Sequence, residues 1–240
     1  MGRIKRYRTA LSRHHRSRGF GIHSPFAFNF VRFVLREKSP YYCYDYIEEL
    51  RQAVIETMRD HKPHPKVASF KDLKMLFRIT NFFNSPHILQ VGTNYGLTSA
   101  SMLSVSSSND LYLYEPSLGR FPVLGNVLTP YLESIQSYNL LEVALAEYSQ
   151  VASESHAMPF ILINSLPKPD DMAVLKICLL QLLSGDCVIV MRHLNHDARL
   201  KSLWSDVKDA MTHGQSFTNE KIGLIFVSKK YNLEHFFLWF

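Results

Sequence analysis

The chain has 240 residues, of which 46% are hydrophobic, and its formal net charge is +6. This length suits one α/β domain with an N-terminal extension, and no stretch approaches the roughly 18 consecutive apolar residues of a membrane span. The three cysteines lack metal-ligand spacing, which favours reduced thiols in the core. Because no apolar signal core adjoins the basic start, we expect a cytoplasmic protein without a membrane span.

The positive charge is concentrated at the N-terminus. Residues 1–18 carry seven basic residues and no acid, which leaves 20 basic and 21 acidic residues in the rest of the chain. Such an arm suits contact with nucleic acid or an anionic surface. No nucleic-acid-binding motif accompanies it, so a solvated tail is the stronger interpretation and a nucleic-acid partner the weaker one.

A first helix is predicted after the arm. Ser24 is a good N-cap and Pro25 suits the first turn, so we expect a helix from Pro25 to about Arg36. His23 lies in the loop before it. That histidine is a candidate pocket and catalytic residue, with a structural role in the loop as the alternative.

Two further helices are expected before the main domain and at its start. One covers about residues 46–59, and a Pro/His-rich linker follows it. Ser69 with Asp72 three positions later resembles a capping box and begins the next helix. We therefore predict a basic arm and helical extension over 1–68 and an α/β domain over 69–240.

A glycine turn follows the first predicted strand. Residues 87–91 are mostly apolar and run into a short polar turn, after which apolar residues recur at helical spacing. Glycines permit positive φ and let a ligand approach the backbone closely, and the N–H groups that follow favour an anion. The turn is a candidate cradle for a small molecule, with a plain βα turn as the alternative; its residues are Gly92, Thr93, Asn94, Tyr95 and Gly96.

A second strand, over 111–115, ends in a carboxylate. Glu115 lies nineteen positions after Gly96. In dinucleotide-binding folds an acid about 20 residues beyond the glycine turn accepts hydrogen bonds from ribose hydroxyls. The spacing favours a ribose-bearing ligand over a merely solvated acid.

Strands and helices alternate from residue 87 onward. This alternation predicts a doubly wound, mostly parallel sheet with right-handed crossovers. The last two strands are joined by a short turn, so we expect them to be antiparallel at one edge. The seven predicted strands cover about 87–91, 111–115, 141–146, 160–164, 187–192, 216–220 and 222–229.

Two segments resemble a known family. Gln90-Val-Gly-Thr-Asn-Tyr-Gly96 resembles the first motif of class I S-adenosylmethionine-dependent methyltransferases of the O-methyltransferase-like branch, and Tyr114-Glu-Pro-Ser117 resembles the second. The segments 18–26 and 234–240 are similar to those of a bacterial group of such proteins. The resemblance implies a class I methyltransferase, Rossmann-like fold and S-adenosylmethionine, not a nicotinamide, as the cofactor.

The resemblance also implies a set of cofactor-binding residues at the carboxyl ends of the strands. It places Glu147 and Tyr148 against the adenine, although core packing is an equal interpretation for Tyr148. The implied set is Gln90, Gly92, Thr93, Asn94, Tyr95, Gly96, Glu115, Ser117, Glu147, Tyr148 and Asn164.

Three positions depart from the family pattern. Gln90 stands where the first motif usually has a carboxylate, and Asn164 stands where metal-dependent relatives carry an aspartate. Arg192 and His193 stand where those relatives carry an acidic pair. Because magnesium needs anionic oxygen ligands, we expect no metal site. Arg192 could hold an anionic acceptor or balance a nearby carboxylate.

A methyl acceptor with a hydroxyl group gains from a general base. His193, His196 and His23 are the candidates, because imidazole titrates near neutrality. No motif ties them to that role, so solvated loop residues are the alternative for His193 and His196.

The leading hypothesis is an S-adenosylmethionine-dependent methyltransferase that acts on a small molecule without a metal. The alternative is a catalytically reduced binding or structural protein on the same fold, and a weaker one is nucleic-acid methylation guided by the basic arm. The apolar end, 235–240, predicts packing on the body or at a subunit interface, such as that of a homodimer.

Overall fold

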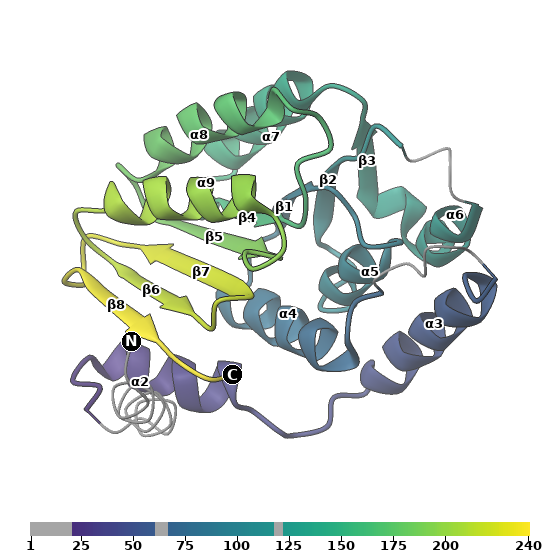
Figure 1. Cartoon of the computed structure of the whole chain (residues 1–240), viewed down its shortest axis with the longest axis horizontal. Helices are drawn as coiled ribbons and strands as arrows, with labels where there is room; N and C mark the ends of the chain where they lie inside the picture. Colours follow the sequence, from purple (N-terminus) through teal and green to yellow (C-terminus); the bar gives the residue numbers. More distant parts are fainter. Residues whose placement is uncertain (1–20, 61–66, 118–121) are drawn as a thin grey trace.

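One mixed β-sheet forms the centre of the molecule (Figure 1). In the computed structural model residues 21–60, 67–117 and 122–240 are described, so the basic arm and the predicted linker over 61–66 lie outside them. The order of the eight strands in the described sheet is β3-β2-β1-β4-β5-β7-β6-β8. Among the described residues, no helix combines the length and apolarity needed to cross a bilayer.

The sheet is parallel on one side and mixed on the other. Strands β1 to β5 all run in one direction, whereas β7 is antiparallel to both β5 and β6, and β8 is parallel to β6. The predicted α/β class and the antiparallel β6–β7 pair are confirmed. The strands are β1 (His87–Val91), β2 (Asp110–Tyr114), β3 (Ile135–Tyr138), β4 (Phe160–Ile163), β5 (Cys187–Arg192), β6 (Gln215–Thr218), β7 (Ile222–Val227) and β8 (Glu234–Phe237).

Two strand predictions need correction. The strand expected over 141–146 is wrong, because that segment begins the helix α7 (Leu141–Glu154), and the third strand is the half-exposed Ile135–Tyr138. The sheet also has eight strands and not seven. The extra strand, β8, pairs with β6 from Gln215 opposite Glu234, so β8 and not the β6–β7 pair forms that edge.

The predicted helix starts are confirmed by their caps. Ser24 accepts a hydrogen bond from the Ala27 N–H at 3.3 Å, and Ser69 accepts one from the Asp72 N–H at 3.1 Å. The described helices other than α7 are α2 (Pro25–Phe30), its π-helical continuation η1 (Val31–Leu35), α3 (Tyr44–Thr57), α4 (Phe70–Phe83), α5 (Leu97–Leu103), α6 (Pro122–Leu128), the 3-10 helix η3 (Thr129–Ser134), α8 (Asp171–Leu182) and α9 (Ala198–Asp209).

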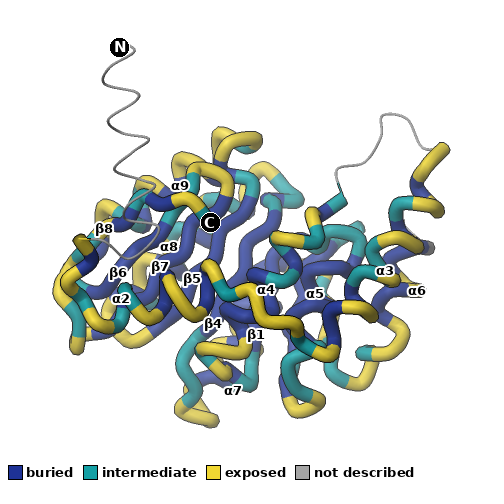
Figure 2. Tube along the Cα trace, turned by 90° about the horizontal axis from the view of Figure 1, so that it is seen from below, coloured by how far each residue is buried: buried dark blue, intermediate teal, exposed yellow. Residues whose placement is uncertain are grey.

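The central strands β1, β2, β4, β5 and β7 are almost completely buried, and Figure 2 shows the middle of the sheet in dark blue. Side chains alternate along each strand, so Ile88 belongs to the hydrophobic cluster that includes residues of α2 to α6, while Leu89 belongs to the cluster that includes residues of α7, α8 and α9. Layers of helix, sheet and helix follow from this alternation (Figure 1).

Helices α2, η1 and α3 share the core with α4 and α5. Phe26 stacks on Phe226 of β7 at 4.7 Å between ring centroids. The buried Arg78 of α4 donates from Nε to the Val34 carbonyl at 2.7 Å and from Nη2 to the Leu35 carbonyl at 3.4 Å, which satisfies acceptors at the end of η1. The proposed boundary at residue 68 therefore separates elements that share one hydrophobic core.

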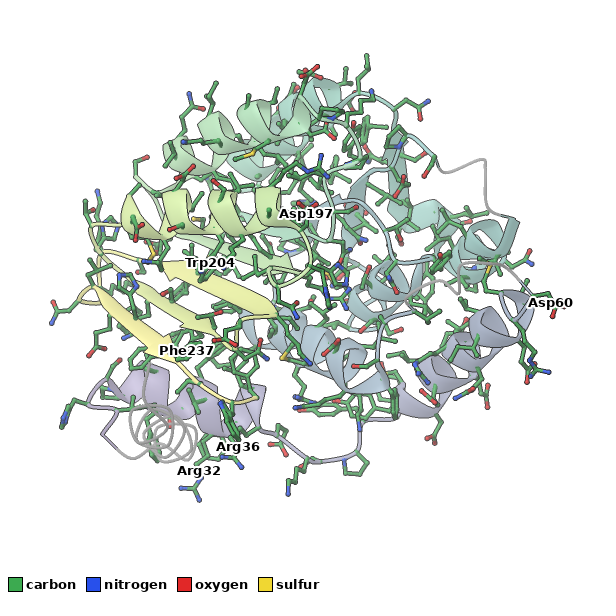
Figure 3. The ribbon with its side chains drawn as sticks, in the orientation of Figure 1. Arg32, Arg36, Asp60, Asp197, Trp204 and Phe237 are labelled. Carbon is green, nitrogen blue, oxygen red and sulfur yellow. The ribbon has the colours of Figure 1, made fainter. Side chains whose placement is uncertain are left out.

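We predict that Gly223→Ala destabilises the fold. A Cβ at Gly223 of β7 would lie 2.5–2.7 Å from three ring atoms of the buried Trp204, which comes from α9 above the sheet (Figure 3). Overpacking of this kind costs about 1–3 kcal/mol of unfolding free energy, measurable by urea denaturation. Gly185→Ala is the matched control, because no atom lies within 4 Å of its Cβ position. Equal stability of the two variants would contradict the prediction.

Candidate functional site

The glycine turn connects β1 to α5. Gly92 and Gly96 have φ of 71° and 79°, which favours glycine at both positions. The Gly92 N–H donates to the Tyr114 carbonyl of β2 at 2.9 Å, and the Gly96 N–H donates to Thr93 Oγ1 at 2.9 Å. A Cβ at Gly92 would lie 2.0 Å from Ser165 Oγ. Gly92 thus lets the loop after β4 approach the turn.

Two other residues of the turn shape it. Asn94 Oδ1 accepts a hydrogen bond from the Ala68 N–H at 2.7 Å, which ties the turn to the segment that enters α4. Tyr95 has a φ of 53°, unusual for a side chain of this size, and it packs against the core below. Asn94 therefore fixes the turn to the segment before α4, and Tyr95 fixes it to the hydrophobic core.

The Gln90 amide is fully engaged beneath the turn. Its Nε2 donates to the Gly92 carbonyl and to Thr98 Oγ1, both at 2.9 Å, and its Oε1 accepts from Ser99 Oγ at 2.9 Å. The side chain is completely buried. Gln90 therefore supports the turn from below.

The Asn164 amide, at the end of β4, donates to the same two oxygens. Its Nδ2 lies 2.9 Å from the Gly92 carbonyl oxygen and 3.0 Å from Thr98 Oγ1. A carboxylate at either position 90 or position 164 has no N–H to donate and would face the Gly92 carbonyl as a second acceptor. Gln90 and Asn164, the two amides that depart from the family pattern, therefore supply N–H donors to the same two oxygens.

The Glu115 carboxylate lies beside the turn, directly after β2. Its Oε2 accepts from the Thr93 N–H at 3.0 Å, and its Oε1 accepts from the Ser117 N–H at 3.1 Å and from the Ser117 hydroxyl. The structure thus brings together three residues that the sequence predicted for the site.

Arg192, the last residue of β5, lies next to Asn164. Only 1% of the residue is exposed, and its Nη1 donates to Asn164 Oδ1 at 2.9 Å. Its Nη2 lies 3.5 Å from Asp72 Oδ2, and its Nε has no hydrogen-bond partner among the described residues. Burial lowers the pKa of the guanidinium and Asp72 raises it, but an arginine side chain stays charged.

These residues do not suit a hard divalent cation. The oxygen of Asn164 already accepts from a guanidinium, whose positive charge would repel a metal ion at the same place. Within 21–60, 67–117 and 122–240, no group of three or more His, Cys, Asp or Glu side chains is placed to hold a metal.

His193 follows Arg192 and contacts the main chain of Asn164. Its φ is 62°, and its Nδ1 lies 2.9 Å from the Asn164 carbonyl oxygen. Because a carbonyl can only accept, Nδ1 carries the proton of the neutral ring and Nε2 keeps a lone pair. Burial, and then the neighbouring Arg192 charge, lower the pKa of His193 from its ordinary 6.5. The imidazole is therefore neutral at pH 7 and can accept a proton at Nε2.

His23 lies far from this group. Ser24, its neighbour, accepts a hydrogen bond at 2.7 Å from Nε2 of Gln215, the first residue of β6. Because β6 runs in the same direction as β5, Gln215 marks the amino edge of the sheet, opposite the glycine turn. The structure does not bring His23 to the site. His196 is exposed in the turn after His193.

Glu147 and Tyr148 also lie elsewhere. Their placement at the adenine assumed a strand over 141–146, but both residues belong to α7. The buried Tyr148 hydroxyl is 2.7 Å from the N–H and 3.1 Å from the carbonyl of Phe160, at the amino end of β4. Glu147 is exposed and accepts from the Tyr138 hydroxyl at 2.7 Å.

Sequence reasoning missed three residues of the site, which are Asp72, Thr98 and Ser99. Thr98 and Ser99 could have been found, because a hydroxyl-rich run in an otherwise apolar short helix needs buried hydrogen-bond partners. Asp72 was assigned only a capping role. Its contact with Arg192 joins residues 120 positions apart, which no local pattern reveals.

The sequence matches no protein-family model and no curated protein. The structure is similar to an O-methyltransferase from Bacillus cereus in complex with SAH, at 13% identity and a TM-score of 0.52, over 81% of this chain and 94% of that one. It is also similar to the O-methyltransferase TomG from Streptomyces achromogenes in complex with SAM, at 14% identity and a TM-score of 0.53, over 82% and 95%.

A third similar structure is cofactor-bound Rv0187 from MTB, at 12% identity and a TM-score of 0.52, over 85% of this chain and 96% of that one. Identities this low describe the fold and not the activity. The chain therefore has the fold of the class I S-adenosylmethionine-dependent methyltransferases.

Proposed function

We propose that this protein is an S-adenosylmethionine-dependent methyltransferase that acts on a small molecule without a metal. The observation that carries the proposal is the Glu115 carboxylate held against the Gly92–Gly96 turn at the carboxyl edge of the sheet. Ligands of such sheets bind at this edge, and two of the similar structures hold SAM or SAH.

The Glu115 carboxylate is suited to accept hydrogen bonds from the hydroxyls of a ribose. A carboxylate has about four acceptor sites, and three hydrogen bonds reach Glu115 here. The Ser117 hydroxyl is the donor that ribose hydroxyls can replace, since the two backbone N–H groups would continue to orient the carboxylate. Bound there, the cofactor would supply a methyl group on a positively charged sulfur.

His193 is the proposed general base. Its Nε2 lone pair can take the proton of an acceptor hydroxyl, and the Asn164 carbonyl holds the ring in the tautomer that this role needs. Backbone strain at a non-glycine residue with positive φ is typical of functional positions. His23 has no place in this proposal, because it lies at the opposite edge.

A second candidate function is binding without turnover on the same fold. It is favoured by the amides of Gln90 and Asn164, which are both engaged in holding the turn. The nucleic-acid alternative depends on the arm over 1–18, which lies outside the described residues, and so receives no support from the structure.

We predict that S-adenosylhomocysteine binds to the wild-type protein and that Glu115→Gln weakens binding about tenfold. The variant loses charge-assisted hydrogen bonds to the ribose, worth about 1–2 kcal/mol. Isothermal titration calorimetry with S-adenosylmethionine and S-adenosylhomocysteine measures the change. Glu147→Gln is the matched control, because this exposed carboxylate on α7 bonds to Tyr138 and should leave the affinity unchanged.

Absence of binding heat with either compound, from wild-type protein shown by circular dichroism to be folded, would contradict the cofactor assignment. Binding without methyl transfer to a broad panel of acceptors would favour the second candidate function.

We predict that the imidazole of His193 titrates with a midpoint below pH 6.5. Burial and Arg192 disfavour the charged ring, so its pKa is lower in the folded chain than in the unfolded one. The unfolded chain then binds more protons, and stability decreases as the pH falls through 6.5. NMR titration measures the midpoint, with His193→Gln to assign the signal. A midpoint above 6.5 would contradict the predicted direction of the shift.

A further inference from the structure

The guanidinium of Arg192 is buried with incomplete pairing. It offers five N–H donors, and its contacts are Asn164 Oδ1 at 2.9 Å and Asp72 Oδ2 at 3.5 Å, while Nε has no partner among the described residues. Removing a charge from water is costly unless the charge is paired and hydrogen-bonded. The guanidinium of Arg192 therefore has N–H donors available to bind an anion.

The counter-ion of Arg192 is loosely held. A distance of 3.5 Å exceeds the roughly 2.7–2.9 Å of a charge-assisted N–H···O bond. The Asp72 side chain is 35% exposed, in the first turn of α4, whereas that of Arg192 is 2% exposed. Water thus reaches the carboxylate side of the pair, and a carboxylate from solution can compete with Asp72 for the guanidinium.

The same asparagine joins this cation to the proposed base. Arg192 donates to the side-chain oxygen of Asn164, and His193 donates to its main-chain oxygen. Both groups therefore lie at the end of β4, beside the glycine turn that the Asn164 amide holds. A small molecule at this place meets a fixed positive charge and a proton acceptor together.

We propose that Arg192 determines acceptor specificity by binding the carboxylate of a small hydroxy acid, which displaces Asp72. This inference rests on the proposed function and names its substrate class. The hydroxyl of the same molecule lies next to His193. Its proton passes to Nε2 and its oxygen forms the new bond to the methyl carbon, while the electron pair of the former carbon–sulfur bond stays on the sulfur.

A carboxylate suits this position better than a phosphate. Asp72 stays attached to the chain when it is displaced, so a bound carboxylate adds one negative charge beside it. A phosphate dianion would add two negative charges, and Asp72 would repel it more strongly. Guanidinium geometry also matches a carboxylate through two parallel hydrogen bonds.

The test uses 2-, 3- and 4-hydroxybenzoate and the three matched hydroxybenzamides, which keep the hydroxyl but lack the charge. Each is titrated calorimetrically into protein saturated with S-adenosylhomocysteine. We expect at least one acid to bind about tenfold more tightly than its amide, as one charge-assisted interaction implies. In Arg192→Met this preference disappears, whereas Arg199→Met, which removes an exposed arginine on α9, leaves it unchanged.

Asp72→Asn gives the decisive comparison. Removing the competing carboxylate should strengthen binding of the preferred acid about threefold or more and leave its amide unchanged, whereas a purely structural Asp72–Arg192 pair predicts no gain. This variant keeps the proposal testable if Arg192→Met does not fold. Equal affinity for every acid and its amide, no binding of any probe, or weaker acid binding by Asp72→Asn would overturn the proposal.

If S-adenosylhomocysteine does not bind, the same titrations are made on the unliganded protein. An acid preference that depends on Arg192 would then support the anion site although the proposed methyltransferase function fails. Absence of that preference would overturn the anion site as well.

Discussion

The arrangement of the site depends on two oxygens that two amides share. The Gly92 carbonyl and Thr98 Oγ1 each accept hydrogen bonds from Gln90 on β1 and from Asn164 after β4. These groups are buried, so loss of one amide would remove a hydrogen bond from each oxygen, and loss of both would leave the oxygens without a donor from either amide, at a cost of about 1–3 kcal/mol for each unsatisfied acceptor. The shared acceptors therefore favour amides at both positions, and they connect the turn to two neighbouring strands.

The orientation of each further group follows from this constraint. Because Asn164 directs its Nδ2 toward the Gly92 carbonyl, its Oδ1 must face away, toward a donor, and Arg192 supplies that donor. A buried guanidinium needs a counter-ion, which Asp72 provides from the first turn of α4. The main-chain oxygen of Asn164 then sets the tautomer of His193. Residues from four separate elements are thus ordered by one asparagine.

Local patterns predicted those parts of the fold that local interactions determine. The caps at Ser24 and Ser69, the glycine turn and the buried strands β1, β2, β4 and β5 follow from spacing along the chain. The apolar run at the start of α7 is equally typical of a buried strand, and β3 is short and half-exposed. For this reason the third strand was predicted over 141–146, where α7 begins, and not at β3. β8 could not be predicted, because it depends on pairing with β6 nineteen residues earlier. The contact of Asp72 with Arg192 could not be predicted for the same reason, because it joins residues far apart in the sequence.

A guanidinium and a divalent metal ion would contribute to methyl transfer in different ways. A metal can both orient an acceptor and lower the pKa of its hydroxyl as a Lewis acid, whereas a guanidinium can orient an anion but hardly activates a hydroxyl. In the proposed reaction the activation must therefore come from a separate base. Burial and, after it, the Arg192 charge lower the pKa of the adjacent His193, which favours the neutral form of that base. In the proposed reaction Arg192 positions the acceptor and assists the base, so the proposal treats the arginine and the histidine as a functional pair.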